Sequence, residues 1–328
     1  MMKIRLSKIA LALGFIASAS VLNVANAASL VGLTTSNQLA FFDSTNVAAS
    51  SLVGISGLSG GERLVGIDLR PSNNTIYGVS DANNIYTLST SGQATFVAGL
   101  RTVSTTDGVS TSTPYSIRPN VGYGFDFNPV ADFAGGASLR FINTAGDNLA
   151  INVNTNGTLA GVVGNTASNI GTGYSAAAYT NSTPNGPLGS TQLYYINSDT
   201  NTLNLHVPLR DANGNVLATS NFNAPNIVTV GNLGLGEGVD IVSADGFEIF
   251  SDSFAFAALT IVSGSGARDA ATNLYSINLQ NGQATLAGLF NGTLRGLTAA
   301  PSAVPVPAAA WLFGSALLGL AGFRRKFA

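Results

Sequence analysis

A short phrase, glycine–apolar–aspartate–apolar, recurs along this chain and constrains the fold more than any other feature. It occurs in full at residues 66–69 (GIDL), 124–127 (GFDF) and 238–241 (GVDI), with degenerate copies at 176–179 (AAAY) and 296–299 (GLTA). The third positions, 68, 126, 178, 240 and 298, lie 58, 52, 62 and 58 residues apart. A repeat of this length indicates similar units that stack on, or circle around, one another.

Each unit contains about four short strand-like runs. The runs are rich in Val, Ile, Tyr, Phe and Thr, and Asn, Gly, Ser and Asp separate them, which is typical of an all-β protein. Phrases inside the units also return: residues 75–77 (TIY) resemble 273–275 (NLY), and residues 92–96 (GQATF) resemble 282–286 (GQATL). Four-stranded sheets repeated around an axis are the pattern of a β-propeller.

The two ends of the repeated region predict how the ring closes. The body stops after residues 296–299, one strand into the last unit, and residues 30–34 (LVGLT) and 38–42 (QLAFF) can supply strands that this unit lacks. Such sharing leaves no open sheet edge. We therefore predict an all-β fold, a β-propeller of five blades, or of six if residues 240–289 contain another. A β-sandwich or a β-solenoid is the alternative.

Composition excludes several kinds of chemistry. The chain has no cysteine, which excludes disulfides, zinc–thiolate sites, iron–sulfur clusters and thiol nucleophiles. Residues 28–303 contain eight arginines, no lysine and all 16 acidic residues, a formal charge of −8. Without a basic patch to hold a phosphate backbone, nucleic acid is a disfavoured partner.

The N-terminus has the pattern of a secretory signal peptide. Basic residues come first, an uncharged apolar run follows at 9–22, and the small residues Ala25 and Ala27 flank Asn26. This order predicts a signal peptide over residues 1–27, cut by signal peptidase after Ala27. A permanent membrane helix is the alternative, but the run is short for one.

The C-terminus has a second apolar run with a different arrangement. Pro305 and Pro307 precede an uncharged run of 16 residues, 308–323, which contains Trp311. The basic cluster Arg324, Arg325 and Lys326 ends the chain. Basic residues stay on the cytoplasmic side of a membrane, so this tail would present residues 28–303 outside the cytoplasm.

This tail, residues 304–328, closely resembles the PEP-CTERM sorting tail of Gram-negative bacteria. All three parts of that tail occur in order: a proline motif, an apolar helix and a terminal basic cluster. The resemblance implies recognition by a membrane exosortase, removal of the tail, and release or attachment at the envelope. Val306 replaces the central glutamate of the family motif, so efficient cleavage is not implied. An uncleaved single-span anchor is the alternative.

The body also resembles a family of secreted bacterial proteins whose domain has no assigned function. The resemblance rests on residues 64–71 (LVGIDLRP) and, in part, on residues 122–129 (GYGFDFNP). It covers most of the body and implies no biochemical activity. Members of that family often precede PEP-CTERM tails.

The sharpest candidate site is formed by the aspartates of the repeated phrase, Asp68, Asp126 and Asp240. If their strands are innermost in their blades, the three carboxylates lie at equivalent heights near the channel. A hard cation such as Ca²⁺ would relieve their repulsion with oxygen ligands. The structural alternative is that each aspartate accepts hydrogen bonds from the turn after its strand. The sequence implies no other cofactor.

Two catalytic alternatives remain open at this stage. Paired carboxylates hydrolyse glycosides when they face a sugar cleft, but such clefts usually carry Trp platforms, and the body has no Trp. A Ser-His-Asp hydrolase would need His206, the only histidine, as its base. His206 alternates with the leucines of a strand-like run, so we expect it to face solvent.

These features together predict an exported protein of the cell envelope or extracellular matrix. The body is expected to be a non-enzymatic binding or structural module, with exosortase and exopolysaccharide as partners. The polysaccharide partner is implied by the resemblance of the tail. A secreted glycan-active hydrolase that uses the channel carboxylates is the alternative function.

Overall fold

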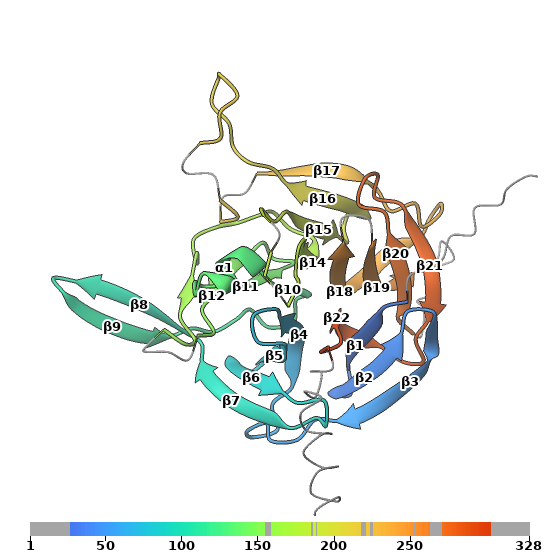
Figure 1. The fold of residues 1–328 in the computed structure, drawn as a ribbon, viewed down its shortest axis with the longest axis horizontal. Coiled ribbons are helices and arrows are strands. Elements are labelled where there is room, and N and C mark those ends of the chain that lie inside the picture. Colours follow the sequence, from blue (N-terminus) through green and yellow to red (C-terminus); the bar gives the residue numbers. More distant parts are fainter. Residues whose placement is uncertain are drawn as a thin grey trace, which may run out of the picture.

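The computed structural model describes residues 27–302, apart from gaps at 155–158, 185, 188, 218–220, 224–225, 252–253 and 263–270. The described residues form five four-stranded antiparallel sheets, arranged as blades around a common axis that Figure 1 views end-on. The prediction of a five-bladed β-propeller is confirmed. Ala25 and the tail 304–328 lie outside the described residues, and no helix within the described part is long and apolar enough to cross a membrane.

Four blades are built from consecutive strands, and the fifth is shared between the two ends of the body. We call the first four blades I to IV and the fifth the closing blade. From the innermost strand outwards, blade I contains β4 (Leu64–Arg70), β5 (Thr75–Ser80), β6 (Asn84–Leu88) and β7 (Ala94–Gly99); blade II contains β10 (Tyr123–Phe127), β11 (Leu139–Asn143), β12 (Asn148–Ile151) and β13 (Val163–Gly164); blade III contains β14 (Tyr174–Tyr179), β15 (Leu193–Asn197), β16 (Thr202–His206) and β17 (Ile227–Asn232); blade IV contains β18 (Asp240–Ser251), β19 (Phe254–Val262), β20 (Asn273–Ile277) and β21 (Ala284–Leu289); the closing blade contains β22 (Leu294–Ala299), β1 (Ser29–Thr34), β2 (Gln38–Asp43) and β3 (Asn46–Gly54).

The closing blade joins the ends of the body as the sequence predicted. Strand β22 pairs antiparallel with β1, with Leu30 opposite Ala299 and Gly32 opposite Leu297. The extended stretch from 240 to 289 is one blade with a long β18, so there is no sixth blade in the described residues.

Apolar clusters fill the interfaces between neighbouring blades. Each of five clusters draws buried side chains from two adjacent blades; examples are Val79 with Phe127 (I and II), Ile142 with Tyr195 (II and III), Ile196 with Ile249 (III and IV), Phe256 with Leu30 (IV and closing), and Leu33 with Ile67 (closing and I). Burying one large aliphatic or aromatic side chain stabilises a fold by about 1.5–3 kcal/mol. These interfaces therefore hold the ring together in a chain that has no disulfides.

The first position of the repeated phrase allows the innermost strands to approach closely. A methyl group added to Gly124 would lie 2.9 Å from the Cα atom of Ala176 on the next blade. On Gly66 it would lie 2.1 Å from the Phe125 ring. Only glycine fits where the neighbouring chain comes this near.

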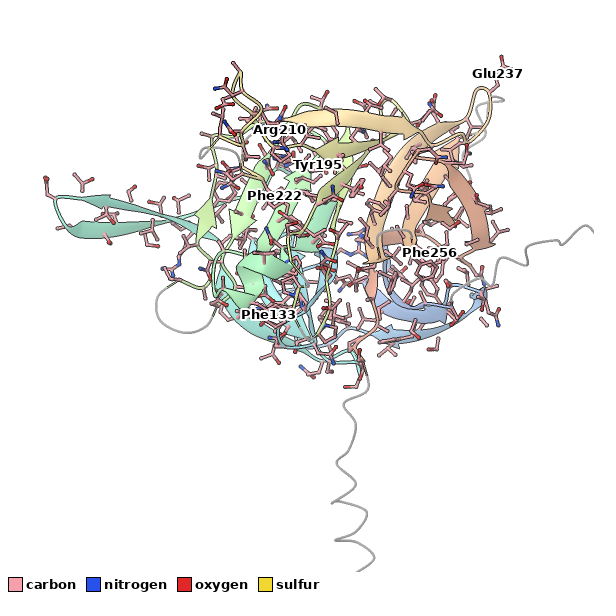
Figure 2. All side chains as sticks on the ribbon, turned by 45° about the horizontal axis from the view of Figure 1, so that its top comes forward. Phe133, Tyr195, Arg210, Phe222, Glu237 and Phe256 are labelled. Carbon is pink, nitrogen blue, oxygen red and sulfur yellow. The ribbon has the colours of Figure 1, made fainter. Side chains whose placement is uncertain are left out.

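Two elements lie outside the blades. Strands β8 (Arg101–Thr106) and β9 (Val109–Pro114) form a hairpin that projects from the ring, as Figure 2 shows. The helix α1 (Pro129–Phe133) follows β10, and the side chain of Asn128 caps its N-terminus by accepting from Ala131 N.

We expect Gly124→Ala to destabilise the protein by about 1–3 kcal/mol, because the new methyl group meets backbone that cannot move without separating blades II and III. Gly54→Ala on the outer strand β3 is the matched control, since nothing lies within 4 Å of its added methyl group. Urea unfolding of both variants measures the difference. Equal urea midpoints for the two variants would show that the close approach of the innermost strands does not determine the stability of the fold.

Candidate functional site

The third position of the repeated phrase lies on the innermost strand of every blade. Asp68 lies on β4, Asp126 on β10, Ala178 on β14 and Thr298 on β22, and in blade IV this place on β18 is taken by Glu248. None of these five residues is more than 5% exposed. Because the strands run side by side around the axis, residues from distant parts of the sequence meet there.

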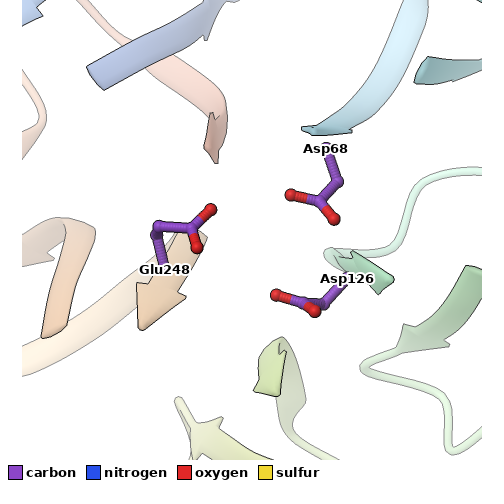
Figure 3. A group of neighbouring side chains, drawn as sticks. All are labelled: Asp68, Asp126 and Glu248. Atoms are coloured by element: carbon purple, nitrogen blue, oxygen red, sulfur yellow. The ribbon is translucent and has the colours of Figure 1, made fainter. Parts of the chain in front are cut away.

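Three of these residues are acids that converge. Asp68, Asp126 and Glu248 each offer one carboxylate oxygen, and these oxygens lie within 4.8 Å of one another. Figure 3 shows the three carboxylates facing a common point from three different strands. Residues with only oxygen ligands in such an arrangement could hold a hard cation.

The structure brings Asp68 and Asp126 together as expected, but it does not place Asp240 with them. Asp240 is exposed at the start of β18, where its Oδ1 accepts a hydrogen bond from Asn201 Nδ2 at 3.0 Å. Glu248 occupies the equivalent place eight residues later. The sequence analysis missed Glu248, although residues 246–249 (GFEI) fit the same pattern with Glu in place of Asp and could have identified it.

Asp68 and Glu248 are well supplied with hydrogen-bond donors. Asp68 accepts from Phe127 N and from Thr298 Oγ1, both at 2.8 Å. Glu248 Oε2 accepts from Ala299 N at 3.0 Å and contacts Thr298 Oγ1 at 3.2 Å. Asp126 differs, because its Oδ1 is buried and has no hydrogen-bond partner among the described residues.

Burial gives all three acids an unusual affinity for protons. It raises the pKa of Asp68 to about 7 and that of Glu248 to about 8. Burial first, and then repulsion from Asp68 and Glu248, holds the pKa of Asp126 well above its ordinary range. Two buried arginines form their hydrogen bonds with groups outside the acid cluster. Arg70 Nε donates to Asp132 at 2.6 Å, and Arg140 Nε donates to the Tyr179 hydroxyl at 3.1 Å.

The channel has two chambers of very different size. The acids line a small cavity of about 20 Å³, together with Pro71, Asn74 and Ala299. That space is about one water-sized sphere. A wide cavity of about 860 Å³ lies at the opposite end of the innermost strands and includes Val65, Tyr123, Ser175 and Ile241 from near their starts.

The lining of the wide cavity includes many hydroxyl groups beside apolar residues. All five blades contribute to it, and Asp81, Asp199 and Arg295 add charge. The hydroxyl-bearing residues other than Tyr123 are Thr35, Thr144, Ser175, Ser198, Ser243, Thr260 and Thr293. Ser175 is 1% exposed and its Oγ has no hydrogen-bond partner in the described part of the chain.

His206 does not face solvent, so that prediction was wrong. It is 7% exposed and packs on Phe222, which Figure 2 labels, with ring centroids 5.1 Å apart. Burial first, and then the nearby charge of Arg140, lowers the pKa of His206 to about 4. His206, at the end of β16 in blade III, is therefore a neutral, buried side chain, and it does not line either chamber.

Residues 38–298 match the family described as Domain of unknown function (DUF4394), which covers most of the chain. The chain belongs to this family. No curated protein matches it by sequence.

Two solved structures resemble the fold of this DUF4394 chain. One is the WD40 domain of SCAP from fission yeast, with 10% identity, a TM-score of 0.34, and coverage of 81% of this chain and 50% of that one. The other is the extracellular domain of a putative hybrid two-component system from B. thetaiotaomicron, with 9% identity, a TM-score of 0.36, and coverage of 83% and 38%. The chain spans half or less of either, and the likeness concerns the fold alone.

We expect the protein, freed of divalent cations, to lose stability as pH rises from 6.5 to 8. The folded state still holds protons on the acid cluster in this range, whereas the unfolded chain releases them near pH 4. The free energy of unfolding therefore falls, by up to about 1.4 kcal/mol per pH unit for each such proton. His206 has the opposite sign, but only below about pH 6.5.

Thermal unfolding followed by circular dichroism in a chelator measures this pH dependence. Glu248→Gln is the control, because an amide removes one of the titrating groups and should flatten the curve. A melting temperature that rises between pH 6.5 and 8 in the unmodified protein would contradict the assignment.

Proposed function

We propose that this protein is an exported, non-enzymatic module of the cell envelope or extracellular matrix that binds a saccharide in the wide cavity of its channel. The observation that carries the proposal is the 860 Å³ cavity, to which four of the five blades contribute hydroxyl groups and blade I contributes the carboxylate of Asp81. A volume of this order suits a ligand of several rings.

The lining matches the chemistry of a sugar. Sugar hydroxyls both donate and accept, as Ser and Thr hydroxyls do, and carboxylates such as Asp81 and Asp199 accept strongly from them. The unpartnered Ser175 Oγ needs a partner of this kind, since a buried hydroxyl without one costs free energy. Tyr123 is the one aromatic residue of the same lining.

Export is supported by the two ends of the chain. The signal pattern at 1–27 would carry the protein out of the cytoplasm, and the tail at 304–328 would hold it for exosortase. Neither the body's charge nor its lack of cysteine opposes this compartment.

A glycan hydrolase that uses the acid cluster is less well supported. Hydrolysis needs two carboxyl groups on either side of a glycosidic bond, with room for the sugar between them. The chamber beside Asp68, Asp126 and Glu248 holds about one water-sized sphere, which argues against a sugar there.

We expect Asp199→Ala to weaken saccharide binding by at least about tenfold, because the variant loses an acceptor in the wide cavity. Asp211→Ala is the matched control, since Asp211 is a partly exposed acid on the loop between β16 and β17 that does not line the cavity. Glycan-array binding followed by calorimetry on the positive glycans measures the effect.

Two outcomes of that experiment would contradict the proposal. Equal loss in Asp199→Ala and Asp211→Ala would place binding outside the cavity. Release of reducing sugar from a bound glycan, abolished by Glu248→Gln, would favour the hydrolase.

We expect the mature protein to begin at Ala28 and to end before Trp311, because both terminal segments carry cleavage signals. Intact-mass measurement of the envelope and secreted fractions tests this. Val306→Glu restores the glutamate of the family motif, so it should raise the cleaved fraction. A Trp311-containing peptide in all of the mature protein would identify the tail as a permanent anchor.

A further inference from the structure

We propose that Asp68, Asp126 and Glu248 bind one calcium ion on the channel axis, with the Thr298 hydroxyl as a further ligand. The proposed site is separate from the wide cavity and does not depend on a saccharide. It would make the ring of blades a calcium-stabilised structure.

The first observation is the geometry of the acids. Their three oxygens lie within 4.8 Å of one another around a cavity of about 20 Å³. A Ca²⁺ ion takes about six to eight oxygens at about 2.3–2.6 Å, so oxygens on opposite sides of it are about 5 Å apart. The cluster therefore needs little movement to surround one ion, with water completing the shell.

The second observation is the free oxygen of Asp126. Its side chain is only 2% exposed and is directed into the cluster, yet Oδ1 has no hydrogen-bond donor among the described residues. A buried carboxylate oxygen without a partner is costly. An ion at the common point of the three acids would supply the missing contact.

The surrounding residues supply few hydrogen-bond donors to the three acids. Thr298 Oγ1 has one hydrogen but lies within hydrogen-bond distance of both Asp68 and Glu248. The same oxygen already accepts from Leu69 N at 2.8 Å. One hydroxyl therefore serves two carboxylates, and it does not reach Oδ1 of Asp126, which has no donor among the described residues.

The ligand set selects calcium among the common divalent cations. All its members are oxygens, whereas zinc prefers sites that include histidine or cysteine. Magnesium holds its ligands at about 2.0–2.1 Å in a strict octahedron and gives up its waters reluctantly, which suits a set of buried acids less well. Extracellular calcium modules bind in the range of about 0.1–1 mM, which an exported protein can use.

A bound ion would connect strands that are far apart in the sequence. Its ligands come from blades I, II and IV and from the closing blade, on β4, β10, β18 and β22. Calcium would thus stabilise the folded ring by binding to it and not to the unfolded chain.

The test is calcium titration of the chelator-treated, full-length mature protein by isothermal calorimetry, with melting temperature as a second readout. We expect one ion per chain, a dissociation constant below about 1 mM, and a rise of several degrees in melting temperature at saturation. Magnesium at the same concentration should give a smaller rise.

Asp126→Asn is the decisive variant, because the amide keeps the shape of the side chain and removes one buried charge. It should fold, with an unchanged or higher melting temperature in chelator, and should bind calcium at least tenfold more weakly. Asp240→Asn is the matched control: it alters the exposed acid of the same phrase and should bind as the unmodified protein does.

Calcium binding that survives in Asp126→Asn, or that is lost in Asp240→Asn, would overturn the proposal. A folded protein that binds no calcium at 10-fold above the expected dissociation constant would overturn it too. Saccharide binding in the wide cavity is measured separately, so either proposal can fail without the other.

Discussion

The antiparallel pairing of β22 with β1 is the contact on which the rest of this structure depends. It joins the two ends of the body, so that five sheets close into a ring and β1 has a partner strand on both sides. Closure also brings Thr298, near the end of the body, against Asp68 and Glu248. Without this pairing there would be neither a channel nor a cluster at its axis.

Closure creates a conflict between packing and charge. The innermost strands approach closely because small residues occupy the first position of each phrase, and this approach removes water from the third position. Burying an unpaired carboxylate is expensive, so the acids respond by holding protons or by gaining a partner. The pKa values of Asp68 and Glu248 are raised because these carboxyl groups are buried. Five-bladed packing alone does not require acids there, as Ala178 shows.

Much of the fold could be predicted because each blade corresponds to one unit of a repeat in the sequence. The five phrases fix the number of blades, and the incomplete last unit indicates how the ring closes. Asp68 and Asp126 were predictable because β4 and β10 are short and each contains a single copy of the phrase. Glu248 was missed because β18 is 12 residues long with a register shift between Ala244 and Phe247, and both 238–241 and 246–249 fit the phrase.

Other parts of the structure had no local signal at all. His206 is covered by Phe222, which comes from a connection 16 residues further along the chain, so alternation within its own strand could not reveal burial. The wide cavity combines residues from all five blades, and its Ser and Thr residues have nothing in the local sequence to distinguish them from other Ser and Thr. Such sites depend on the ring as a whole, and a repeat pattern predicts the ring but not which side chains meet inside it.

The order of residues around the ring explains why Oδ1 of Asp126 lacks a donor among the described residues. Thr298 lies between Glu248 and Asp68, and its hydroxyl contacts both. The corresponding place between Asp126 and Glu248 is taken by Ala178, which has no hydroxyl. A threonine there would give Asp126 a donor and would close the cluster with protein groups alone. Because one member of the ring is alanine, the oxygen of Asp126 remains available, and a small cation is the partner that the chamber beside it can hold.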